Sequence, residues 1–139
     1  LESNVPRVYR IIKKDDDGLP NVGPRGLDVR RGVDIDLDAQ ANVIVNGKGM
    51  SVAPSWRDIN VLRIPKRLRG KVPGANGSNS TYCFRSGDGP FQQGAFAAGL
   101  TLEPDSPKHG NVAPEKKVSI GVYEADLAAT RSAWVEDEN

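Results

Sequence analysis

Residues 5–14 read Val-Pro-Arg-Val-Tyr-Arg-Ile-Ile-Lys-Lys, a stretch rich in β-branched and aromatic side chains. The turn-forming run Asp15-Asp16-Asp17-Gly18 follows directly and is expected to end the segment. We therefore predict a strand from about Arg7 to Lys13. Alternate residues of that strand share one face, in this case Val8, Arg10 and Ile12.

Other segments with strand-like patterns follow along the chain. Residues 33–38 alternate without a break between apolar residues and aspartate, which predicts a half-buried strand with its aspartates in water. Shorter strands are expected at 43–45, 59–64, 81–85 and 118–122. The spacing then becomes helical, which predicts one helix over 124–135. The acidic run 136–138 is expected to fray.

Glycine and proline are abundant, at 15 and 10 of the 139 residues. Long loops are therefore expected at 18–32, 70–80 and 87–99, and a helical bundle is excluded. The length fits one core, so we predict a single α+β domain over residues 1–139.

Charge is balanced over the whole chain, with 19 Lys and Arg against 18 Asp and Glu. No global field therefore attracts nucleic acid or an anionic membrane. Residues 57–71, which we call the basic segment, are an exception, because Asp58 is the only acid among six cations there. The basic segment is either a solvated edge or a binding patch for phosphate or an acidic partner.

The single cysteine, Cys83, excludes an internal disulfide and a Cys-rich zinc site, and it suits a reducing cytoplasm. The longest uncharged run is too short and polar for a membrane span. The aspartates of 33–38 lack the turn glycine and bidentate glutamate of a calcium loop. No metal site and no membrane association are therefore predicted.

Three short patches resemble one family, the ADP-ribosyltransferase-like toxins of the bacterial type VI secretion system. The closest likeness is to its small cytoplasm-acting effectors, each neutralised by a dedicated immunity protein. The matching patches are Val8-Tyr9-Arg10, Gly47-Lys48-Gly49-Met50-Ser51-Val52 and His109-Gly110-Asn111-Val112-Ala113-Pro114. The resemblance implies an α+β fold with two small, mostly antiparallel sheets around a cleft for NAD, and few helices.

The resemblance also assigns catalytic residues. The family's arginine, serine and histidine correspond to Arg10, Ser51 and His109, although Met50 stands where the family has a threonine. The usual catalytic glutamate has no clear counterpart, and Glu115 and Glu124 are candidates.

These residue types suit cleavage of the nicotinamide–ribose bond, whose transition state resembles that of glycoside cleavage. The guanidinium of Arg10 is expected to clamp the pyrophosphate. Ser51 is expected to bind the nicotinamide ribose or amide, and His109 to hold the 2′-hydroxyl or act as a base. The remaining cofactor-binding candidates are Gly49, for close backbone approach, and Tyr82 and Tyr123, for ring stacking.

The implied function is a bacterial toxin that cleaves NAD in the cytoplasm and transfers ADP-ribose to a protein, to nucleic acid or to water. Its implied partner is an acidic immunity protein. Two alternatives remain at this point: an RNA 2′-phosphotransferase-like enzyme that grips RNA with the basic segment, and a non-enzymatic protein-binding module. Serine hydrolase chemistry is disfavoured, because Ser51 lacks the Gly-x-Ser-x-Gly motif.

Overall fold

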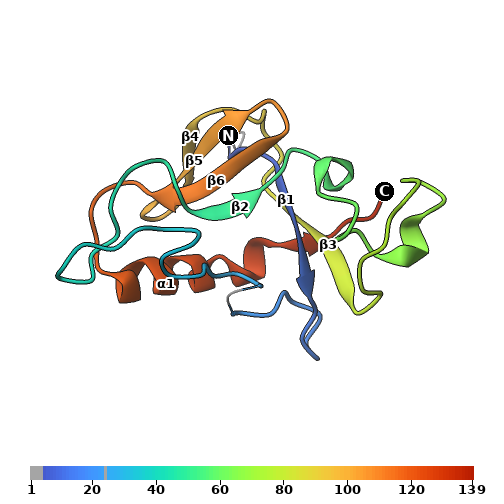
Figure 1. Ribbon diagram of the computed structural model, residues 1–139, viewed down its shortest axis with the longest axis horizontal. Coiled ribbons are helices and arrows are strands. Elements are labelled where there is room, and N and C mark those ends of the chain that lie inside the picture. Colours follow the sequence, from blue (N-terminus) through green and yellow to red (C-terminus); the bar gives the residue numbers. More distant parts are fainter. Residues whose placement is uncertain (1–4, 24) are drawn as a thin grey trace.

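The computed structural model describes residues 5–23 and 25–139, which form two small antiparallel sheets and one α-helix (Figure 1). The fold is thus mixed α+β, as predicted. The strands are β1 (Val8–Lys13), β2 (Met50–Val52), β3 (Thr81–Ser86), β4 (Gly94–Ala97), β5 (Leu100–Ser106), β6 (His109–Pro114) and β7 (Val135–Glu136). The helix α1 spans Ile120–Ala129, and short 3-10 helices span Trp56–Asp58, Lys66–Leu68 and Arg131–Ala133.

One sheet has the strand order β1-β3-β7 and the other the order β2-β6-β5-β4. A single bridge connects them, because the Tyr9 amide donates to the Ala53 carbonyl at 2.7 Å and the Ala53 amide donates to the Tyr9 carbonyl at 3.1 Å. The middle of β1 therefore runs beside the end of β2, which brings Arg10 close to Ser51.

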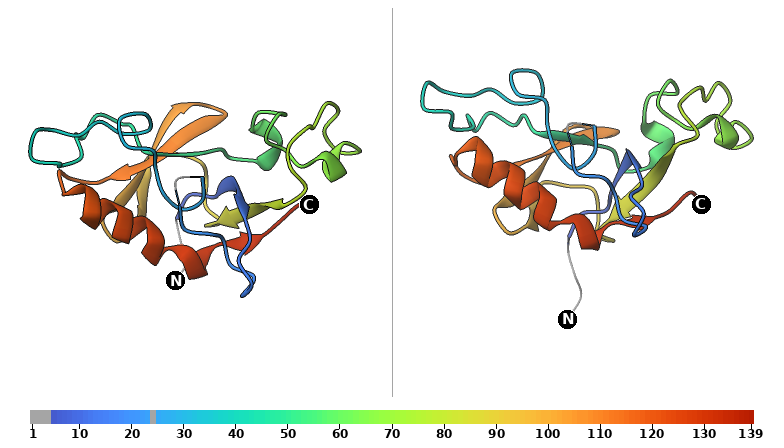
Figure 2. Two further views of the ribbon diagram at one scale, coloured as in Figure 1. Left: turned by 60° about the horizontal axis from the view of Figure 1, so that its bottom comes forward. Right: turned by 90° about the horizontal axis from the view of Figure 1, so that it is seen from below.

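Strand β1 is buried on both faces. Val8 and Ile12 belong to the main core, which also includes residues of α1, while Tyr9 and Ile11 belong to a second cluster around Trp56. Figures 1 and 2 show α1 running alongside the four-stranded sheet. Burying each such apolar side chain stabilises the fold by about 1.5–3 kcal/mol. The predicted strands at 7–13 and 81–85 are confirmed as β1 and β3, and the structure shows that they pair with each other.

The helix begins and ends earlier than predicted. The side chain of Ser119 accepts a hydrogen bond from the Val122 amide at 3.2 Å and caps the helix, so the predicted strand at 118–122 is wrong. At the other end, the Thr130 hydroxyl donates to the Leu127 carbonyl and accepts from the Trp134 indole. These bonds replace a further helical turn.

The alternating segment 33–38 is not a regular strand, because its aspartates bind neighbouring groups. Asp34 accepts the Arg30 amide at 2.7 Å, and Asp38 accepts two amides of its own turn at 2.9 Å. Such local bonds compete with ladder pairing. Residues 43–45 form only an isolated bridge, and 59–64 turn around Asn60, so these two predicted strands are also wrong.

The predicted loops 18–32 and 70–80 hold no named helix or strand over their described residues, whereas 87–99 contains β4. The prediction that residues 136–138 fray is wrong. Strand β7 pairs with β3, and the Asp137 amide donates to the Cys83 carbonyl at 2.8 Å.

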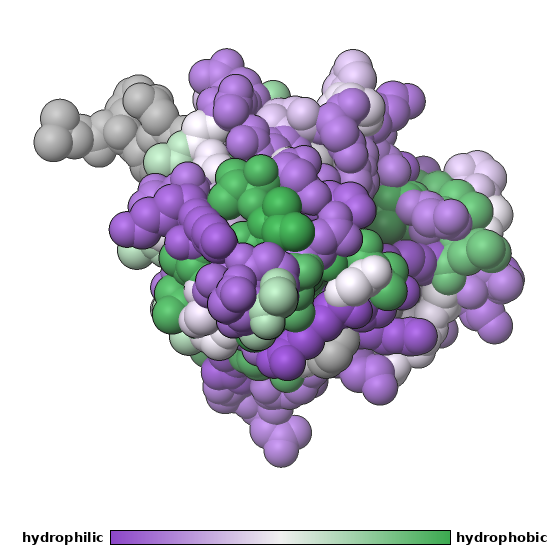
Figure 3. All heavy atoms as spheres, turned by 60° about the vertical axis from the view of Figure 1, so that its left-hand side comes forward, coloured by the Kyte–Doolittle hydropathy of each residue, from purple (hydrophilic) through white to green (hydrophobic). Residues whose placement is uncertain are grey.

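No helix in the described part of the chain is long and apolar enough to cross a membrane. The face shown in Figure 3 exposes hydrophobic side chains in separate places, divided by hydrophilic ones. The exposed large hydrophobic residues include Val33, Ile44 and Val45, which lie on the long segment between β1 and β2.

Candidate active site

A cavity of about 280 Å³, here called the site cavity, lies where β1, β2 and the β5–β6 hairpin meet. Its lining includes Arg10, Ser51 and His109, which come from three separate strands. The structure therefore brings the three sequence-predicted catalytic residues together. Asp58 is the one carboxylate among the described residues that line this cavity.

Ser51, His109 and Asp105 form a continuous hydrogen-bonded chain. Ser51 Oγ lies 2.5 Å from His109 Nε2, and His109 Nδ1 lies 2.7 Å and 2.9 Å from the two carboxylate oxygens of Asp105. A carboxylate only accepts hydrogen bonds, so Nδ1 carries the proton. In the neutral imidazole, Nε2 is then the acceptor and the Ser51 hydroxyl donates to it.

The backbone explains how these three side chains meet. Ser51 pairs with Asn111 in the β2–β6 ladder, and Ser106 pairs with His109 across the tight β5–β6 turn. The register shifts between Pro104 and Ser106, which leaves Asp105 as the extra residue of a β-bulge. A bulge re-aims its side chain, and here the Asp105 carboxylate reaches the histidine four residues ahead.

Arg10 is buried and holds two backbone segments together. Its Nε donates to the Gly26 carbonyl at 2.8 Å, and its Nη1 donates to the Ser51 carbonyl at 2.6 Å. Burial, and after it the charge of Arg63, lowers the pKa of Arg10 to about 10. The guanidinium thus positions Ser51 through its backbone, with two of its three nitrogens already committed.

A second cavity, of about 370 Å³, adjoins the site cavity and shares Arg10, Ser51 and Arg63 with it. We call it the arginine cavity, because four of its six lining residues are arginine. The lining consists of Arg10, Arg25, Arg30, Asp34, Ser51 and Arg63.

The other predicted cofactor-binding residues, Gly49, Tyr82 and Tyr123, make contacts within the fold instead of lining either cavity. A Cβ on Gly49 would lie 2.3 Å from the Val112 carbonyl oxygen, so strand packing requires this glycine. The Tyr123 ring is fully buried, and its hydroxyl donates to the Val112 carbonyl and accepts from the Met50 amide. Tyr82 lies under the ammonium of Lys14, outside both cavities. No ring in the described part stacks on the site cavity from these positions.

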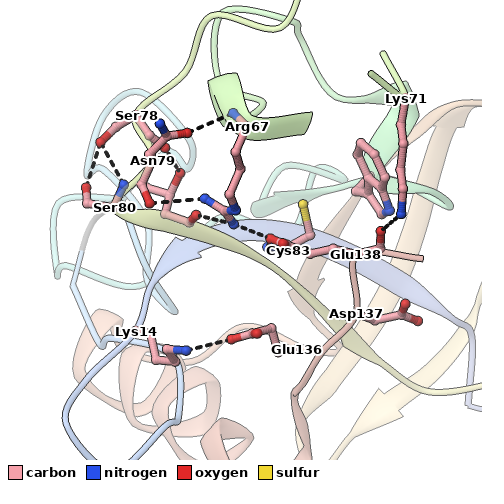
Figure 4. Close-up of polar contacts among 12 residues, drawn as sticks. Lys14, Arg67, Lys71, Ser78, Asn79, Ser80, Cys83, Glu136, Asp137 and Glu138 are labelled. Atoms are coloured by element: carbon pink, nitrogen blue, oxygen red, sulfur yellow. Dashed lines mark hydrogen bonds and ion pairs between the residues drawn. The ribbon is translucent and has the colours of Figure 1, made fainter. Parts of the chain in front are cut away.

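Neither candidate glutamate lines the site cavity or the arginine cavity, and Glu124 pairs with Arg31 at 2.8 Å. The basic segment is engaged by residues 136–139, which we call the acidic tail. Arg67 pairs with Glu138 at 2.5 Å, and Lys71 donates to the Glu138 carbonyl at 2.7 Å (Figure 4).

Sequence reasoning missed Asp105 and Arg25, and it considered Arg63 and Asp58 only as members of the basic segment. A signal for Asp105 existed, because Asp-Ser-Pro-Lys-His places an acid and a histidine on either side of a turn. Arg63 carried the signal of the basic segment, whereas Asp58 and Arg25 belong to no local motif and reach the cavities through the fold.

Comparisons with family models, curated proteins and solved structures find no match for this chain. No cluster of three or more metal-ligating side chains occurs among the described residues. The function of the site is therefore inferred from its own residues.

Proposed function

We propose that this chain is an ADP-ribosyltransferase-like enzyme that cleaves NAD at the nicotinamide–ribose bond and acts as a toxin in the bacterial cytoplasm. The observation that carries the proposal is the convergence of Ser51 and His109, in direct hydrogen-bond contact, beside a buried Arg10. Two small antiparallel sheets around a cleft are also the architecture that the sequence resemblance implies.

NAD supplies an anomeric carbon whose bond to the nicotinamide nitrogen breaks, with the electron pair leaving on nicotinamide and positive charge developing on the ribose. Asp58 provides a carboxylate at the wall of the site cavity, where it stabilises that charge. It takes the place for which Glu115 and Glu124 were candidates.

His109 acts as the base that receives the proton of the attacking hydroxyl. Asp105 holds Nδ1 in its protonated form, so Nε2 is available as the acceptor. The Ser51 hydroxyl gives up its bond to Nε2 when the attacking hydroxyl takes that place, and it then holds a ribose hydroxyl. Arg10 fixes the position of the Ser51 backbone in β2 by donating a hydrogen bond to the Ser51 carbonyl.

Release of nicotinamide from NAD by the purified chain tests the proposal. Wild-type protein is expected to release it, and Ser51→Ala is expected to reduce the rate by about a hundredfold. The Ser51 contact with Arg10 uses a backbone carbonyl, so this variant should melt at the same temperature as wild type. Lys116→Gln, at an exposed position outside both cavities, is the matched control.

Expression in bacteria tests the toxin part of the proposal. Growth should stop on induction of the wild type and continue with Ser51→Ala at an equal level of folded protein. Growth that continues with folded wild type argues against a toxin, and an absence of nicotinamide release argues against the enzyme.

The toxin is also expected to have an acidic immunity protein. Because the acidic tail already engages Arg67 and Lys71, we place the contact of this partner over the arginine cavity. Its association should slow as salt is added.

A second candidate is ester hydrolysis, which the Ser51–His109–Asp105 chain of hydrogen bonds favours. Ser51 lies within a paired strand rather than on a strand-to-helix turn, which leaves it without the usual nucleophile elbow. Burst release of p-nitrophenol from p-nitrophenyl acetate, lost in Ser51→Ala, would favour this alternative over NAD cleavage.

A further inference from the structure

We infer that the arginine cavity is a diphosphate site, with Arg25 and Arg63 as its two binding arms, and that a dinucleotide lies across three adjoining cavities with its diphosphate there. The inference deepens the proposed function and rests on it for the identity of the dinucleotide. The anion site itself follows from the charges around the cavity.

Positive charge in the arginine cavity is not balanced by the protein. The lining holds four guanidiniums and one carboxylate, that of Asp34. Asp34 is already taken by Arg30, whose amide and guanidinium both donate to it at 2.7–3.3 Å. Arg10, Arg25 and Arg63 are therefore left without a carboxylate of their own in this cavity.

The two proposed arms are free to bind. Both side chains are exposed, and neither guanidinium has a hydrogen-bond or ion-pair partner among residues 5–23 and 25–139. Most other arginines differ in this respect, since Arg67, Arg85 and Arg131 are all held by carboxylates. A guanidinium fork binds phosphate oxygens in pairs, so two free forks suit two adjacent phosphates.

The charge of the buried Arg10 guanidinium in this cavity is electrostatically unfavourable, and a bound anion would offset that unfavourable energy. Burial and the Arg63 charge both disfavour the charged form of Arg10, whose pKa falls to about 10. An anion bound between them would reverse this electrostatic penalty. The protein therefore holds like charges together in the absence of ligand, which is expected of a preorganised anion site.

The neighbouring cavities explain why the ligand is a dinucleotide. The site cavity shares Arg10, Ser51 and Arg63 with the arginine cavity. A polar cavity of about 350 Å³ shares Arg25 and Arg63 with the arginine cavity, and Ile11 and Arg63 with the site cavity; it also presents Asn21 and Ser78. Arg63 therefore lies where the three cavities meet, and an anion site that adjoins two further cavities offers room for two nucleosides joined through a diphosphate. A nucleic acid strand would instead need cations repeated along an extended track.

Titration calorimetry with inorganic pyrophosphate, with ADP-ribose and with a single-stranded RNA oligonucleotide tests the inference at fixed ionic strength. We expect pyrophosphate and ADP-ribose to bind and RNA to bind more weakly. Arg63→Gln and Arg25→Gln should each raise the Kd for pyrophosphate by about tenfold or more, as expected for loss of a charge-assisted hydrogen-bond pair. Lys116→Gln, which removes a charge outside all three cavities, should leave it unchanged.

Ligand-induced thermal stabilisation provides a second readout. Pyrophosphate at about a hundred times its wild-type Kd should raise the melting temperature by roughly 10 °C in wild type, and by about half of that or less in Arg63→Gln at the same concentration. The inference is overturned if pyrophosphate fails to bind, if the two arginine variants bind it as wild type does, or if RNA binds more tightly. Failure of NAD cleavage with pyrophosphate binding intact would remove the proposed reaction and leave the anion site standing.

Discussion

The arginine cavity and the basic segment contain the same kind of residue in opposite circumstances. In the basic segment, Arg67 and Lys71 are bound by Glu138 of the acidic tail (Figure 4). In the arginine cavity, Arg25 and Arg63, the latter itself a member of the basic segment, have no hydrogen-bond or ion-pair partner among the described residues. A cation that the chain itself neutralises stabilises the fold, whereas one left unneutralised beside a cavity is available to a ligand.

The largest difference between the two regions is expected in the rate of nicotinamide release. His109→Ala should reduce nicotinamide release by a factor of about 10²–10⁴, because the proton acceptor of the site is lost. Arg67→Gln, in the basic segment, should stay within about twofold of wild type. Initial rates at saturating NAD measure both, and comparable losses in the two variants would contradict a functional division between the regions.

The arginine cavity is also expected to contribute to stability, because Arg10 holds two backbone segments together. Arg10→Ala should lower the free energy of unfolding by about 2–4 kcal/mol, since it leaves the carbonyls of Gly26 and Ser51 without their buried donor. Urea denaturation measures the change. A loss below 1 kcal/mol would show that water replaces the guanidinium easily.

Acid is expected to weaken the contacts of the acidic tail. Burial raises the pKa of Asp137, but hydrogen bonds from Asn139, Tyr9 and Arg85 outweigh it and hold that pKa below the ordinary value. A carboxyl with a lowered folded-state pKa contributes stability above its unfolded-state pKa, and this contribution is lost as the pH falls through the folded-state value.

Melting temperatures between pH 6 and pH 2 test this sign. Wild type should lose stability as the pH falls below about 4, the ordinary aspartate pKa. Asp137→Asn should be less stable than wild type at pH 6, with the difference shrinking towards pH 2. A difference that stays constant over this range would show that the charge of Asp137 contributes nothing.

The smallest effect is expected for the exposed ion pair that joins the acidic tail to the basic segment. Glu138→Gln should cost about 1 kcal/mol or less, because Arg67 is partly solvated and keeps its bonds to the carbonyls of Asn79 and Thr81. Added salt should reduce the difference from wild type in urea melts. Nicotinamide release should not change, and a drop in rate would show that the tail also shapes the site.

The predicted strands that were correct differ from those that were wrong in the interactions that hold their backbone. Residues 8–13 and 81–86 were predicted correctly because their apolar side chains are buried and pair with each other. Residues 33–38 were not, because aspartates bind nearby amides instead of leaving the backbone free to form a ladder. The helix start was missed because one capping serine outweighed an alternating pattern.

Part of the candidate site was visible in the sequence. Arg10, Ser51 and His109 lie in short patches with a recognisable resemblance, and the structure places them around one cavity. Gly49 directly precedes β2 and Tyr123 lies in α1, and both serve packing, a role that residue type alone does not reveal. Asp105 depended on a bulge, whose register shift is a property of two paired strands.

The sequence by itself determined the α+β composition, the strands at 8–13 and 81–86, and the residue types capable of the proposed chemistry. The tertiary structure alone decided which charges are neutralised. The basic segment is one run of cations in the sequence, yet in the fold Arg67 pairs with the acidic tail whereas Arg63 lines the arginine cavity. Electrostatic energy depends on the distance between charges and on their access to water, and residues far apart in the chain acquire both only when it folds.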